Sequence, residues 1–456
     1  MRTARIPAPA LGAAISIALG LAAVSCAPSG PPPKPHGVIV LLVDCLRFDH
    51  LGADGATRPY TPNLDRLAPA GVRFSDAFVV ASWTRPSVPS LLTGLYPSEH
   101  GLTDFLENDK GVQGAVLSED ALTLAEGMKS AGYATALVGY QSQLSVRFGL
   151  AQGFDFYNNN TRGGEKIDTR FLGWLDEQRG QPFFAYLHYL DIHWPYCPPE
   201  STYGKLGPTA GVIDTCGNWR KLRDDIHSGA VKLTDADRAA LAARYGESLM
   251  ALDGEIGRLF AELEKRGLWD DTLIVLTGDH GEELAERGGI EHGHTLYDEL
   301  LHVPFVFKLP SSWPAERGGT VRELVETRSL LPTLFDAARV ARPERVSAPS
   351  LLPWLLGRGG EKPPIDFVAS EANGMFAVRT REWKLIVTPA EKKSELYDLV
   401  HDPGETRNLA AESPPALAGL QDDLRRWRRT LKPLPTGKAA LDDETVKGLR
   451  ALGYIQ

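Results

Sequence analysis

Residues 271–288 read DTLIVLTGDHGEELAERG. The run at 272–276 is apolar without alternation, which is typical of a strand buried on both faces of a parallel sheet. It leads through two small residues to Asp279 and His280. Because open α/β sheets bind their ligands beyond the carboxyl ends of the strands, this pair is a candidate for chemistry. The stretch predicts an α/β fold whose functional side chains follow the strands.

Further apolar runs predict the rest of this sheet, and they lie at residues 37–43, 134–138, 183–189 and 303–307. A helix is expected to begin at Thr61 and Pro62, with Thr61 as its cap, and residues 236–265 form a long amphipathic pattern. Strands separated by helical segments predict a mainly parallel sheet covered on both faces. Three short runs predict a small antiparallel sheet near the C-terminus, at residues 376–379, 383–387 and 395–399.

The composition is typical of a folded globular protein. The chain has 456 residues, 43% of them hydrophobic and 23% charged, which excludes a disordered, collagen-like or multi-span membrane protein. The net charge is −9. A protein that binds nucleic acid needs a basic face, so nucleic acid is not expected as a partner.

The N-terminus has the pattern of a targeting segment. Arg2 and Arg5 precede an uncharged apolar run at residues 10–24, which is short for a membrane span but fits a secretory signal. The run ends in small residues before Cys26, which resembles a bacterial lipoprotein signal. The alternative is an ordinary signal peptide with an incidental cysteine. We expect an exported protein, periplasmic or at the cell surface, anchored to a bacterial membrane through a lipid on Cys26.

Composition shifts divide the chain into five parts. They are a signal peptide at residues 1–25, a Pro-rich tether at 26–36, a catalytic domain at 37–345, a C-terminal α+β subdomain at 346–430 and a tail at 431–456. An oxidising compartment would allow Cys197 and Cys216 to pair. Cys45 ends an apolar strand and is expected to be buried and free.

Acidic and imidazole side chains follow three of the predicted strands. These residues are Asp44 after the first strand, Asp191 and His193 after the run at 183–189, and Asp279 and His280 after the run at 272–276, with His292, His294 and His302 further on. Carboxylates with an imidazole suit a hard or borderline divalent cation, so the pattern predicts a site for Ca²⁺, Mg²⁺, Mn²⁺ or Zn²⁺. A second metal could use Asp191, His193 and His294.

Segments in a fixed order resemble the sulfatase family of the alkaline phosphatase superfamily. They are VDCLRFDHLG, TPNLDRLAPAGVRF, TRPSVPSLLTGLYPSEHG, HYLDIHWPY, DTLIVLTGDHGEELAERG, HGHTLYDELLHVPFVF and the C-terminal WKLIV with ELYDLVHDPGETRNLA. Each segment alone is weak evidence for the family. The ordered set, which extends over residues 37–411, is strong evidence. The resemblance implies an alkaline-phosphatase-like α/β/α sandwich around the sheet, with a smaller C-terminal antiparallel sheet, and a metal-dependent ester hydrolase.

The resemblance also implies a set of metal ligands. The metal would be held by Asp44, Asp279 and His280 together with the nucleophile. Family sulfatases carry a cysteine, oxidised to formylglycine, at the start of the motif CxPSRxxLLTG, and Thr84 stands at that position here. Cys45 replaces the second aspartate of the family's metal site.

Other matches concern the substrate. Val88 replaces the arginine of the motif, while His193 matches a histidine that contacts the substrate oxyanion. His292 or His294 lies near the family's active-site lysine, and either could bind the oxyanion or protonate the leaving group. The substrate is expected to be a small-molecule, glycan or lipid ester.

Thr84 changes the expected chemistry. Threonine cannot become formylglycine, so no formylglycine is expected, and the route by which its hydrate expels sulfate is closed. A threonine hydroxyl beside a metal can attack phosphorus and form a phosphothreonine, which water then hydrolyses. We therefore expect cleavage of phosphoesters or phosphodiesters to be favoured. The alternatives are a strict sulfuric ester hydrolase, an envelope transferase of phospho-headgroups and an inactive binding lipoprotein.

The remaining polar residues have local alternatives. Arg85 and Arg47 are candidates for binding the substrate anion, although Arg47 could instead pair with a neighbouring aspartate. Ser82 and Ser87 are hydroxyls that compete with Thr84. His188 and His302 are expected to be structural. The segment at 441–456 is expected to be an exposed helix ended by Gly453, with no predicted role.

Overall fold

The computed structural model describes residues 30–56, 60–108, 111–210, 212–360, 363–452, 454 and 455. Residues 32–456 form one compact unit, and the description below concerns that unit. The expected signal segment, including Cys26, lies outside the described residues. Among the helices described, none is long and apolar enough to cross a membrane.

The main sheet has eight strands in the described part of the chain, in the order β12-β2-β11-β8-β1-β7-β5-β6. β11 runs antiparallel to β2 and β8, and every other neighbouring pair is parallel. The strands are β1 (Gly37–Val43), β2 (Gly71–Phe78), β5 (Ala134–Gly139), β6 (Phe156–Asn158), β7 (Phe183–Tyr189), β8 (Thr272–Gly278), β11 (Phe305–Lys308) and β12 (Gly319–Glu326). The predicted, mainly parallel sheet is confirmed.

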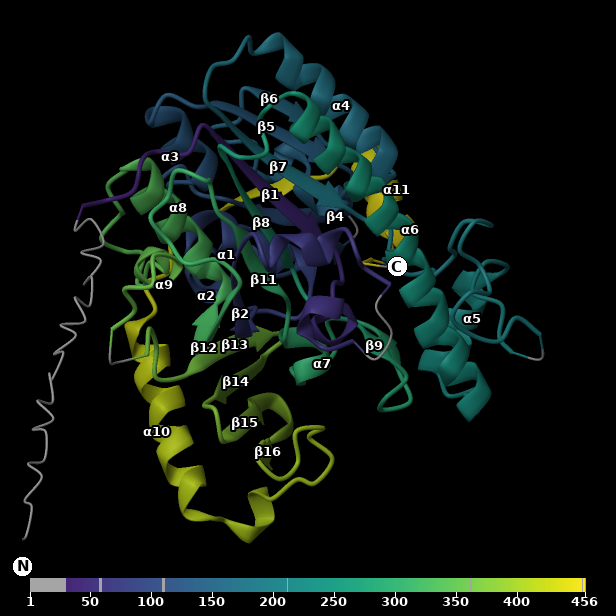
Figure 1. Ribbon diagram of the computed structural model, residues 1–456. Coiled ribbons are helices and arrows are strands. Elements are labelled where there is room, and N and C mark those ends of the chain that lie inside the picture. The colour runs from purple at the N-terminus through teal and green to yellow at the C-terminus, as the bar shows by residue number, and fades with distance from the viewer. Residues whose placement is uncertain are drawn as a thin grey trace, which may run out of the picture. The chain divides into compact units, whose positions relative to one another are not determined.

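Alternate residues of β1 face two separate cores. The even-numbered residues from Val38 to Leu42 pack with the helices α1 (Thr84–Thr93), α3 (Leu124–Ser130) and α8 (Leu330–Ala338). The odd-numbered residues from Ile39 to Val43 pack with α4 (Gly164–Glu177) and α6 (Asp235–Lys265). Helices therefore cover both faces of the sheet (Figure 1). This explains why β1 is apolar at every position.

Two sequence predictions need correction. The expected helix at Thr61 and Pro62 is a single 3-10 turn at Leu64–Leu67. Pro69 comes two residues after the turn, and a proline in a helix interior removes a hydrogen bond and clashes with the preceding turn. The strand expected at 303–307 is displaced toward the C-terminus, to Phe305–Lys308.

A second, four-stranded sheet lies toward the C-terminus. Its strands are β13 (Val368–Ala372), β14 (Met375–Arg379), β15 (Trp383–Thr388) and β16 (Lys393–Asp398), and each neighbouring pair is antiparallel. Helix α10 (Pro415–Thr430) lies along this sheet and buries Leu420, Leu424 and Trp427 (Figure 1). The predicted small antiparallel sheet is confirmed.

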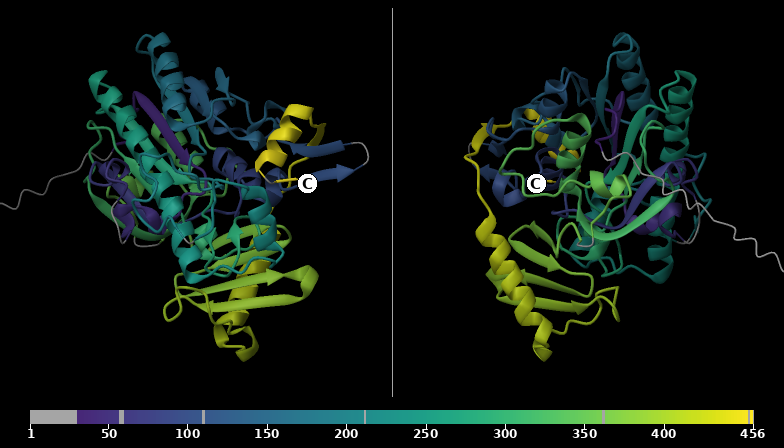
Figure 2. Two further views of the ribbon diagram at one scale, coloured as in Figure 1. Left: turned by 90° about the vertical axis from the view of Figure 1, so that its right-hand side faces the viewer. Right: turned by 60° about the vertical axis from the view of Figure 1, so that its left-hand side comes forward.

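A third sheet joins distant parts of the chain and was not predicted. The tail strand β17 (Gly437–Ala440) pairs with β4 (Gly111–Val116), which pairs with β3 (Phe105–Asn108). The helix α11 (Asp443–Leu452) follows and lies beside this hairpin (Figure 2). The expected helix in the tail is confirmed, but it is not exposed on every side, because Leu449 is fully buried and Leu452 nearly so. Its expected end at Gly453 lies outside the described residues.

Shorter elements complete the described fold. They are α2 (Pro97–His100), α5 (Trp219–His227), α7 (Asp298–Leu301), α9 (Leu352–Leu355), β9 (Glu283–Leu284) and β10 (Ile290–Glu291). Cys197 and Cys216 form a disulfide, as the sequence allowed, and Cys45 is buried and free.

Lys384 in β15 links the second sheet to α7. Its ammonium group is fully buried and lies 2.8 Å from Asp298 Oδ1 and 2.8 Å from Glu405 Oε1. Removing one partner of a buried ion pair leaves an uncompensated charge, so Lys384→Met should lower the free energy of unfolding by about 3–5 kcal/mol. Urea unfolding followed by tryptophan fluorescence measures this loss.

The matched control is Arg381→Ala. Arg381 pairs with Glu323 at 3.3 Å on the surface, where both side chains are exposed. An exposed pair contributes about 0–1 kcal/mol. Equal, small losses in the two variants would contradict the account of Lys384.

Candidate active site

Three neighbouring strands bring the candidate residues to one edge of the main sheet. Val43 of β1 pairs in parallel register with Gly278 of β8 and Tyr189 of β7. The residues that follow these strands therefore emerge side by side. Asp44 follows β1, and Asp279 and His280 follow β8. The site is built on the rigid part of the fold.

Thr84 is the first residue of α1 and is fully buried. Its Oγ1 lies 3.2 Å from Nε2 of His280. The first backbone N–H groups of a helix have no partner within the helix, and they favour an anion at this end. Of the competing hydroxyls, Ser87 donates to the backbone carbonyl of Asp279. Ser82 is buried, and its hydroxyl has no hydrogen-bond partner among the described residues.

His280 aims one ring nitrogen at the two carboxylates. Its Nδ1 lies 2.8 Å from the carbonyl oxygen of Gly281 and can only donate there. That contact assigns the proton to Nδ1 and leaves the lone pair on Nε2. Nε2 lies 3.5 Å from Asp44 Oδ1 and 3.4 Å from Asp279 Oδ2. A neutral imidazole fixed in this way is arranged as a metal ligand.

Asp44 and Asp279 differ in how their charges are compensated. Asp44 Oδ2 accepts a hydrogen bond from Gln141 Nε2 at 2.8 Å and lies 3.3 Å from His188 Nε2. Asp279 Oδ1 accepts from the backbone N–H of Cys45 at 3.3 Å. Asp279 Oδ2 is buried and has no hydrogen-bond partner within the described residues.

The pKa values of these two carboxyls shift in opposite directions. Burial raises the pKa of Asp279, and the neighbouring Asp44 raises it further. Burial also acts to raise the pKa of Asp44, but the hydrogen bond with His188 and the nearby His193 and His280 outweigh it and hold that pKa well below its usual range. Two carboxyls that share one buried space repel each other's charge.

The donor set fits a divalent cation. Asp44, His188 and Asp279 each offer a ligand atom within 4.8 Å of the others, and Nε2 of His280 faces the same space. The unsatisfied Oδ2 of Asp279 is the atom that most requires a cation, because a buried, unpaired carboxylate oxygen is costly. The predicted ligands Asp44, Asp279 and His280 are close enough together to hold such an ion.

A second cluster adjoins the first. Cys45, Glu282 and His292 lie with His280 so that one ligand atom of each is within 4.8 Å of the others. His292 Nδ1 lies 2.9 Å from Glu282 Oε2, and Tyr196 donates to Glu282 Oε1 at 2.6 Å. Burial acts to raise the pKa of Glu282, but His292 outweighs it and lowers that pKa to about 2.

His193 points into the same space. Its Nδ1 lies 2.7 Å from the carbonyl oxygen of Trp194 and donates there, so Nε2 is the ring nitrogen that faces the site. The centroid of the ring is 5.1 Å from that of His292. The structure therefore gathers His193 and His292, two of the predicted histidines, near Thr84.

Other predicted residues lie apart from this cluster. His294 is partly exposed and lies 2.6 Å from Glu283 Oε2. Asp191 accepts from the backbone N–H of Gly164 at 3.1 Å. Within the described residues, Asp191, His193 and His294 do not form one of the groups with metal-ligand spacing. The second metal site expected from the sequence is therefore not formed by these three side chains.

The two predicted anion-binding arginines have other partners. Arg47 donates to Asp49 at 2.9 and 2.7 Å and forms an ion pair with Glu286. The guanidinium of Arg85 lies 4.1 Å and 4.4 Å from the ring centroids of Phe105 and Phe148. Its Nη2 donates to a backbone carbonyl of β4 at 3.0 Å. The charged end of Arg47 is therefore engaged, whereas Nε and Nη1 of Arg85 are buried and have no hydrogen-bond partner among the described residues.

Four residues that contact the site were not predicted from the sequence to take part in it. His188 is buried, as expected, but it also supports Asp44, while Gln141 and Glu282 were not singled out. Tyr454 places its hydroxyl 3.3 Å from Thr84 Oγ1 and 3.2 Å from His193 Nε2. The alternation of β7 could have placed His188 on the face of Asp44. No local pattern marks Tyr454, which is 370 positions from Thr84.

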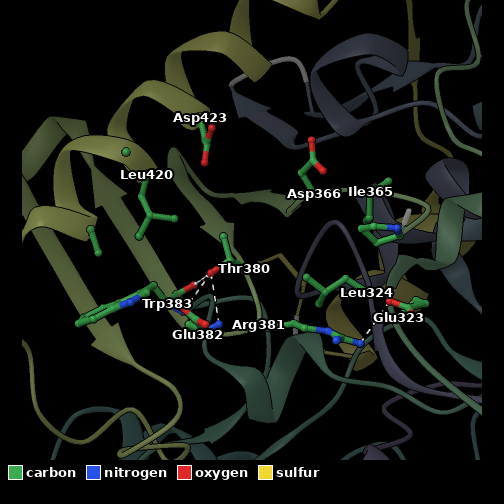
Figure 3. A pocket seen from close by; sticks show the side chains of 13 residues that line it. Glu323, Leu324, Ile365, Asp366, Thr380, Arg381, Glu382, Trp383, Leu420 and Asp423 are labelled. Atoms are coloured by element: carbon green, nitrogen blue, oxygen red, sulfur yellow. Dashed lines mark hydrogen bonds and ion pairs between the residues drawn. The ribbon is translucent and has the colours of Figure 1, made fainter. Parts of the chain in front are cut away.

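A cavity of about 460 Å³ adjoins the cluster and is lined in part by Trp83, His292 and Tyr454. A larger cavity of about 660 Å³ lies between the second sheet and α10, where Arg381 faces Glu323 (Figure 3). Its lining contains none of the metal-ligand groups. The chemistry therefore belongs to the smaller cavity.

An alkaline-phosphatase-like sheet with an acidic and imidazole cluster at its strand ends defines a class of metal-dependent ester hydrolases. Residues 36–340 match the family model described as Sulfatase, and residues 291–430 match the one described as N-sulphoglucosamine sulphohydrolase, C-terminal. The chain belongs to the sulfatase family.

Known proteins agree with this assignment. Arylsulfatase A of Homo sapiens is 26% identical, over 95% of this chain and 92% of that protein. An arylsulfatase of Clostridium perfringens is 23% identical, over 82% of this chain and 90% of that protein. The phosphonate monoester hydrolase of Agrobacterium radiobacter shares the fold, with a TM-score of 0.71 at 22% identity, over 87% of this chain and 96% of that one.

The arrangement of the cluster predicts that the purified protein contains a bound divalent metal. Asp279→Ala removes a charged ligand, so the purified variant should lose most of its bound divalent metal in elemental analysis by mass spectrometry. His294→Ala is the control, because His294 lies outside the cluster, and its metal content should equal that of the wild type. A stoichiometric metal in Asp279→Ala would contradict the assignment.

Proposed function

We propose that this protein is a metal-dependent ester hydrolase in which Thr84 is the nucleophile and phosphorus esters are the preferred substrates. The observation that supports it is the position of Thr84. Its hydroxyl lies at the N-terminus of α1, 3.2 Å from His280 Nε2. The resemblance of the motif puts Thr84 at the family's formylglycine position. Ser87, the nearest competitor in the motif, is engaged with the carbonyl of Asp279.

Asp44, Asp279 and His280 would hold one divalent cation. Carboxylates alone suit Ca²⁺ or Mg²⁺, whereas the added imidazole shifts the preference toward Mn²⁺ or Zn²⁺. When bound, such an ion supplies positive charge that polarises the ester and favours the ionised form of a hydroxyl. Gln141 and His188 fix the orientation of Asp44, and the backbone N–H of Cys45 fixes that of Asp279.

The residues around Thr84 have separable roles. Thr84 Oγ1 forms a bond to phosphorus while the bond from phosphorus to the ester alcohol breaks, and the alcohol leaves with the proton of the Thr84 hydroxyl. Water then attacks phosphorus and breaks the bond to Oγ1, which releases the phosphate and restores the hydroxyl of Thr84. The free backbone N–H groups at the start of α1 bind the non-bridging oxygens. His193 and His292 face the same space and would contact the oxyanion or the leaving group. A threonine cannot form the aldehyde through which formylglycine expels sulfate. Esters of phosphorus are therefore favoured over esters of sulfur.

Hydrolysis of sulfuric esters is the second candidate. The matched family and the curated relatives named arylsulfatase favour it. The fold shared with a phosphonate monoester hydrolase is compatible with phosphorus chemistry. Rates for a sulfate and a phosphate ester of the same alcohol separate the two candidates.

The proposed organisation keeps the boundaries expected from the sequence. The catalytic part is residues 37–345, the C-terminal subdomain 346–430 and the tail 431–456. We further propose that the protein is exported and that the mature chain starts at a lipid-modified Cys26. Its substrates would then be small-molecule, glycan or lipid esters outside the cytoplasm.

Thr84→Val tests the nucleophile because it keeps the size of the side chain and removes the hydroxyl. The turnover of phosphate esters should fall at least about 10³-fold, as when other covalent nucleophiles are removed. Thr84→Ser should keep part of the rate, since a primary hydroxyl remains. Steady-state kinetics with a phosphodiester and a sulfate ester measure both.

The control is Thr93→Val in the same helix. Thr93 is equally buried, but its hydroxyl donates to the carbonyl of Pro89 at 2.6 Å and takes no part in the site. Its rate should remain near that of the wild type. A Thr84→Val enzyme with largely intact turnover would show that Thr84 only begins the helix.

Cys26→Ala tests the membrane anchor. Without the thiol no lipid can be attached, so the variant should move from the membrane to the soluble fraction of the cell. Immunoblots of the fractions and mass spectrometry of the N-terminus measure the change. An unmodified chain that starts at Met1 in the cytoplasmic fraction would contradict the proposal.

A further inference from the structure

A thiol, a carboxylate and an imidazole face one another beside the first metal site. Cys45 Sγ lies 3.6 Å from His292 Nδ1, and Glu282 Oε2 lies 2.9 Å from the same nitrogen. Cys45 and Glu282 are fully buried, and the side chain of His292 is 5% exposed. Three donor atoms of the kinds that bind metals therefore surround a single position, which is shielded from water.

The distances between these atoms fit a tetrahedral ion of the zinc type. Zn–S and Zn–N bonds of about 2.3 and 2.0–2.1 Å put sulfur and nitrogen about 3.5–3.6 Å apart at the tetrahedral angle. Cys45 Sγ and His292 Nδ1 already have this separation. A carboxylate oxygen and the same nitrogen would be about 3.3–3.5 Å apart, so Glu282 must move back by about half an ångström. Its present contact with His292 has the length of a hydrogen bond, which a cation would replace.

Neighbouring residues hold the donors in place. Tyr196 donates to Glu282 Oε1 at 2.6 Å, which leaves Oε2 directed at His292. Cys45 has a left-handed backbone with a φ of 65°, and the hydroxyl of Tyr245 donates to its carbonyl oxygen at 2.7 Å. Residues other than glycine seldom adopt this conformation, so the surrounding structure fixes the direction of the thiol. Hydrogen bonds that orient the ligands in this way are typical of metal sites.

The buried charges also balance with two divalent cations. One cation at Asp44 and Asp279 compensates those two carboxylates but leaves the buried charge of Glu282. Arg47 donates to the backbone carbonyl of Glu282, yet its guanidinium is paired with two other carboxylates. With Cys45 as a thiolate, four negative charges would face two divalent cations, and the region would be neutral.

We propose that Cys45, Glu282 and His292 form a second metal site, for a divalent cation of the zinc type, next to the site at Asp44 and Asp279. Thiolate and imidazole ligands select Zn²⁺ over Mg²⁺ and Ca²⁺, which prefer oxygen. The cation replaces the proton of Cys45, and the proton of His292 Nδ1 moves to Nε2, so one proton is released for each ion bound. The Nε2–H of His292 stays available to the substrate.

The second site is expected to fill after the first one. A thiolate beside carboxylates is disfavoured until a cation is present, whereas the carboxylates of the first site need no such change. Protein as purified is therefore expected to hold its metal at Asp44 and Asp279, and the second ion is loaded by adding metal. When bound, this ion adds positive charge beside the first.

Titration with Co²⁺ tests for the site, because a thiolate bound to Co²⁺ gives an intense charge-transfer band in the near ultraviolet. The full chain is stripped of metal with a chelator and titrated without substrate. We expect two ions per chain, with the band growing as the second one binds. Cys45→Ser, which exchanges one atom, should bind one ion and show no band. Asp279→Ala, loaded in the same way, should bind one ion and keep the band.

Glu282→Gln and Glu283→Gln are a matched pair. Both carboxylates are buried and each lies beside a histidine, Glu282 beside His292 and Glu283 beside His294. Among the described residues, Glu283 belongs to none of the groups with metal-ligand spacing. Glu282→Gln should weaken the binding that produces the band at least about 100-fold, because a ligand matters more than an outer partner. Glu283→Gln should leave this binding unchanged, and thermal unfolding of the metal-free proteins verifies that each variant folds.

Two results would overturn the inference. One ion per chain at saturating Co²⁺, without a thiolate band, would show that a protonated His292 alone balances Glu282. A band that grows with the first ion and is lost in Asp279→Ala would make Cys45 a ligand of the first site. These measurements need no turnover, so failure of the proposed function shows separately, as intact turnover in Thr84→Val.

Discussion

Two fully buried carboxylates lie side by side because β1 and β8 are parallel neighbours in exact register. Asp44 follows Val43, and Asp279 follows Gly278, its partner across the ladder. Like charges in a low-dielectric interior repel strongly, and each also loses its hydration. The structure compensates Asp44 with Gln141 and His188 but leaves Asp279 Oδ2 unsatisfied. A divalent cation would resolve this imbalance, and Thr84 and His280 face the space that it would occupy.

The fold supports this arrangement from several directions. Cores on both faces exclude water from β1 and β8, so the strand ends are rigid. Helix α1 brings the hydroxyl of Thr84 to the same place. The tail then adds β17 to the third sheet and places Tyr454 beside Thr84. Residues from the first strand to the end of the chain thus meet within a few ångströms.

The sequence predicts the parts of this site that depend on local pattern. Apolar runs locate β1, β7 and β8, and the acids that directly follow β1 and β8 are therefore predicted at one edge. Thr84 is identified through its place in a motif. Gln141 and Tyr454 could not be predicted, because their roles arise from tertiary contacts with residues far away in the chain. Asp191 and His294 were predicted from their residue types but lie outside the cluster. In the fold, Asp191 bonds to the backbone of Gly164, and His294 bonds to Glu283.

Arg85 illustrates the same limit. A cation next to the nucleophile in sequence was expected to bind an anion, yet helix geometry separates consecutive side chains by a large angle. Arg85 therefore points between Phe105 and Phe148, where its charge is held by aromatic faces. In the proposed function, substrate anions would be bound by the start of α1, by the cation and by the histidines.

The proposed function requires that the hydroxyl of Thr84 becomes covalently attached to the transferred group. Rapid acid quenching during turnover of a phosphodiester, followed by peptide mapping with mass spectrometry, tests it directly. A phosphoryl ester is expected within the peptide that spans Ser82 to Ser90, with the modification on Thr84. A phosphoryl group on Ser82 or Ser87 would contradict it.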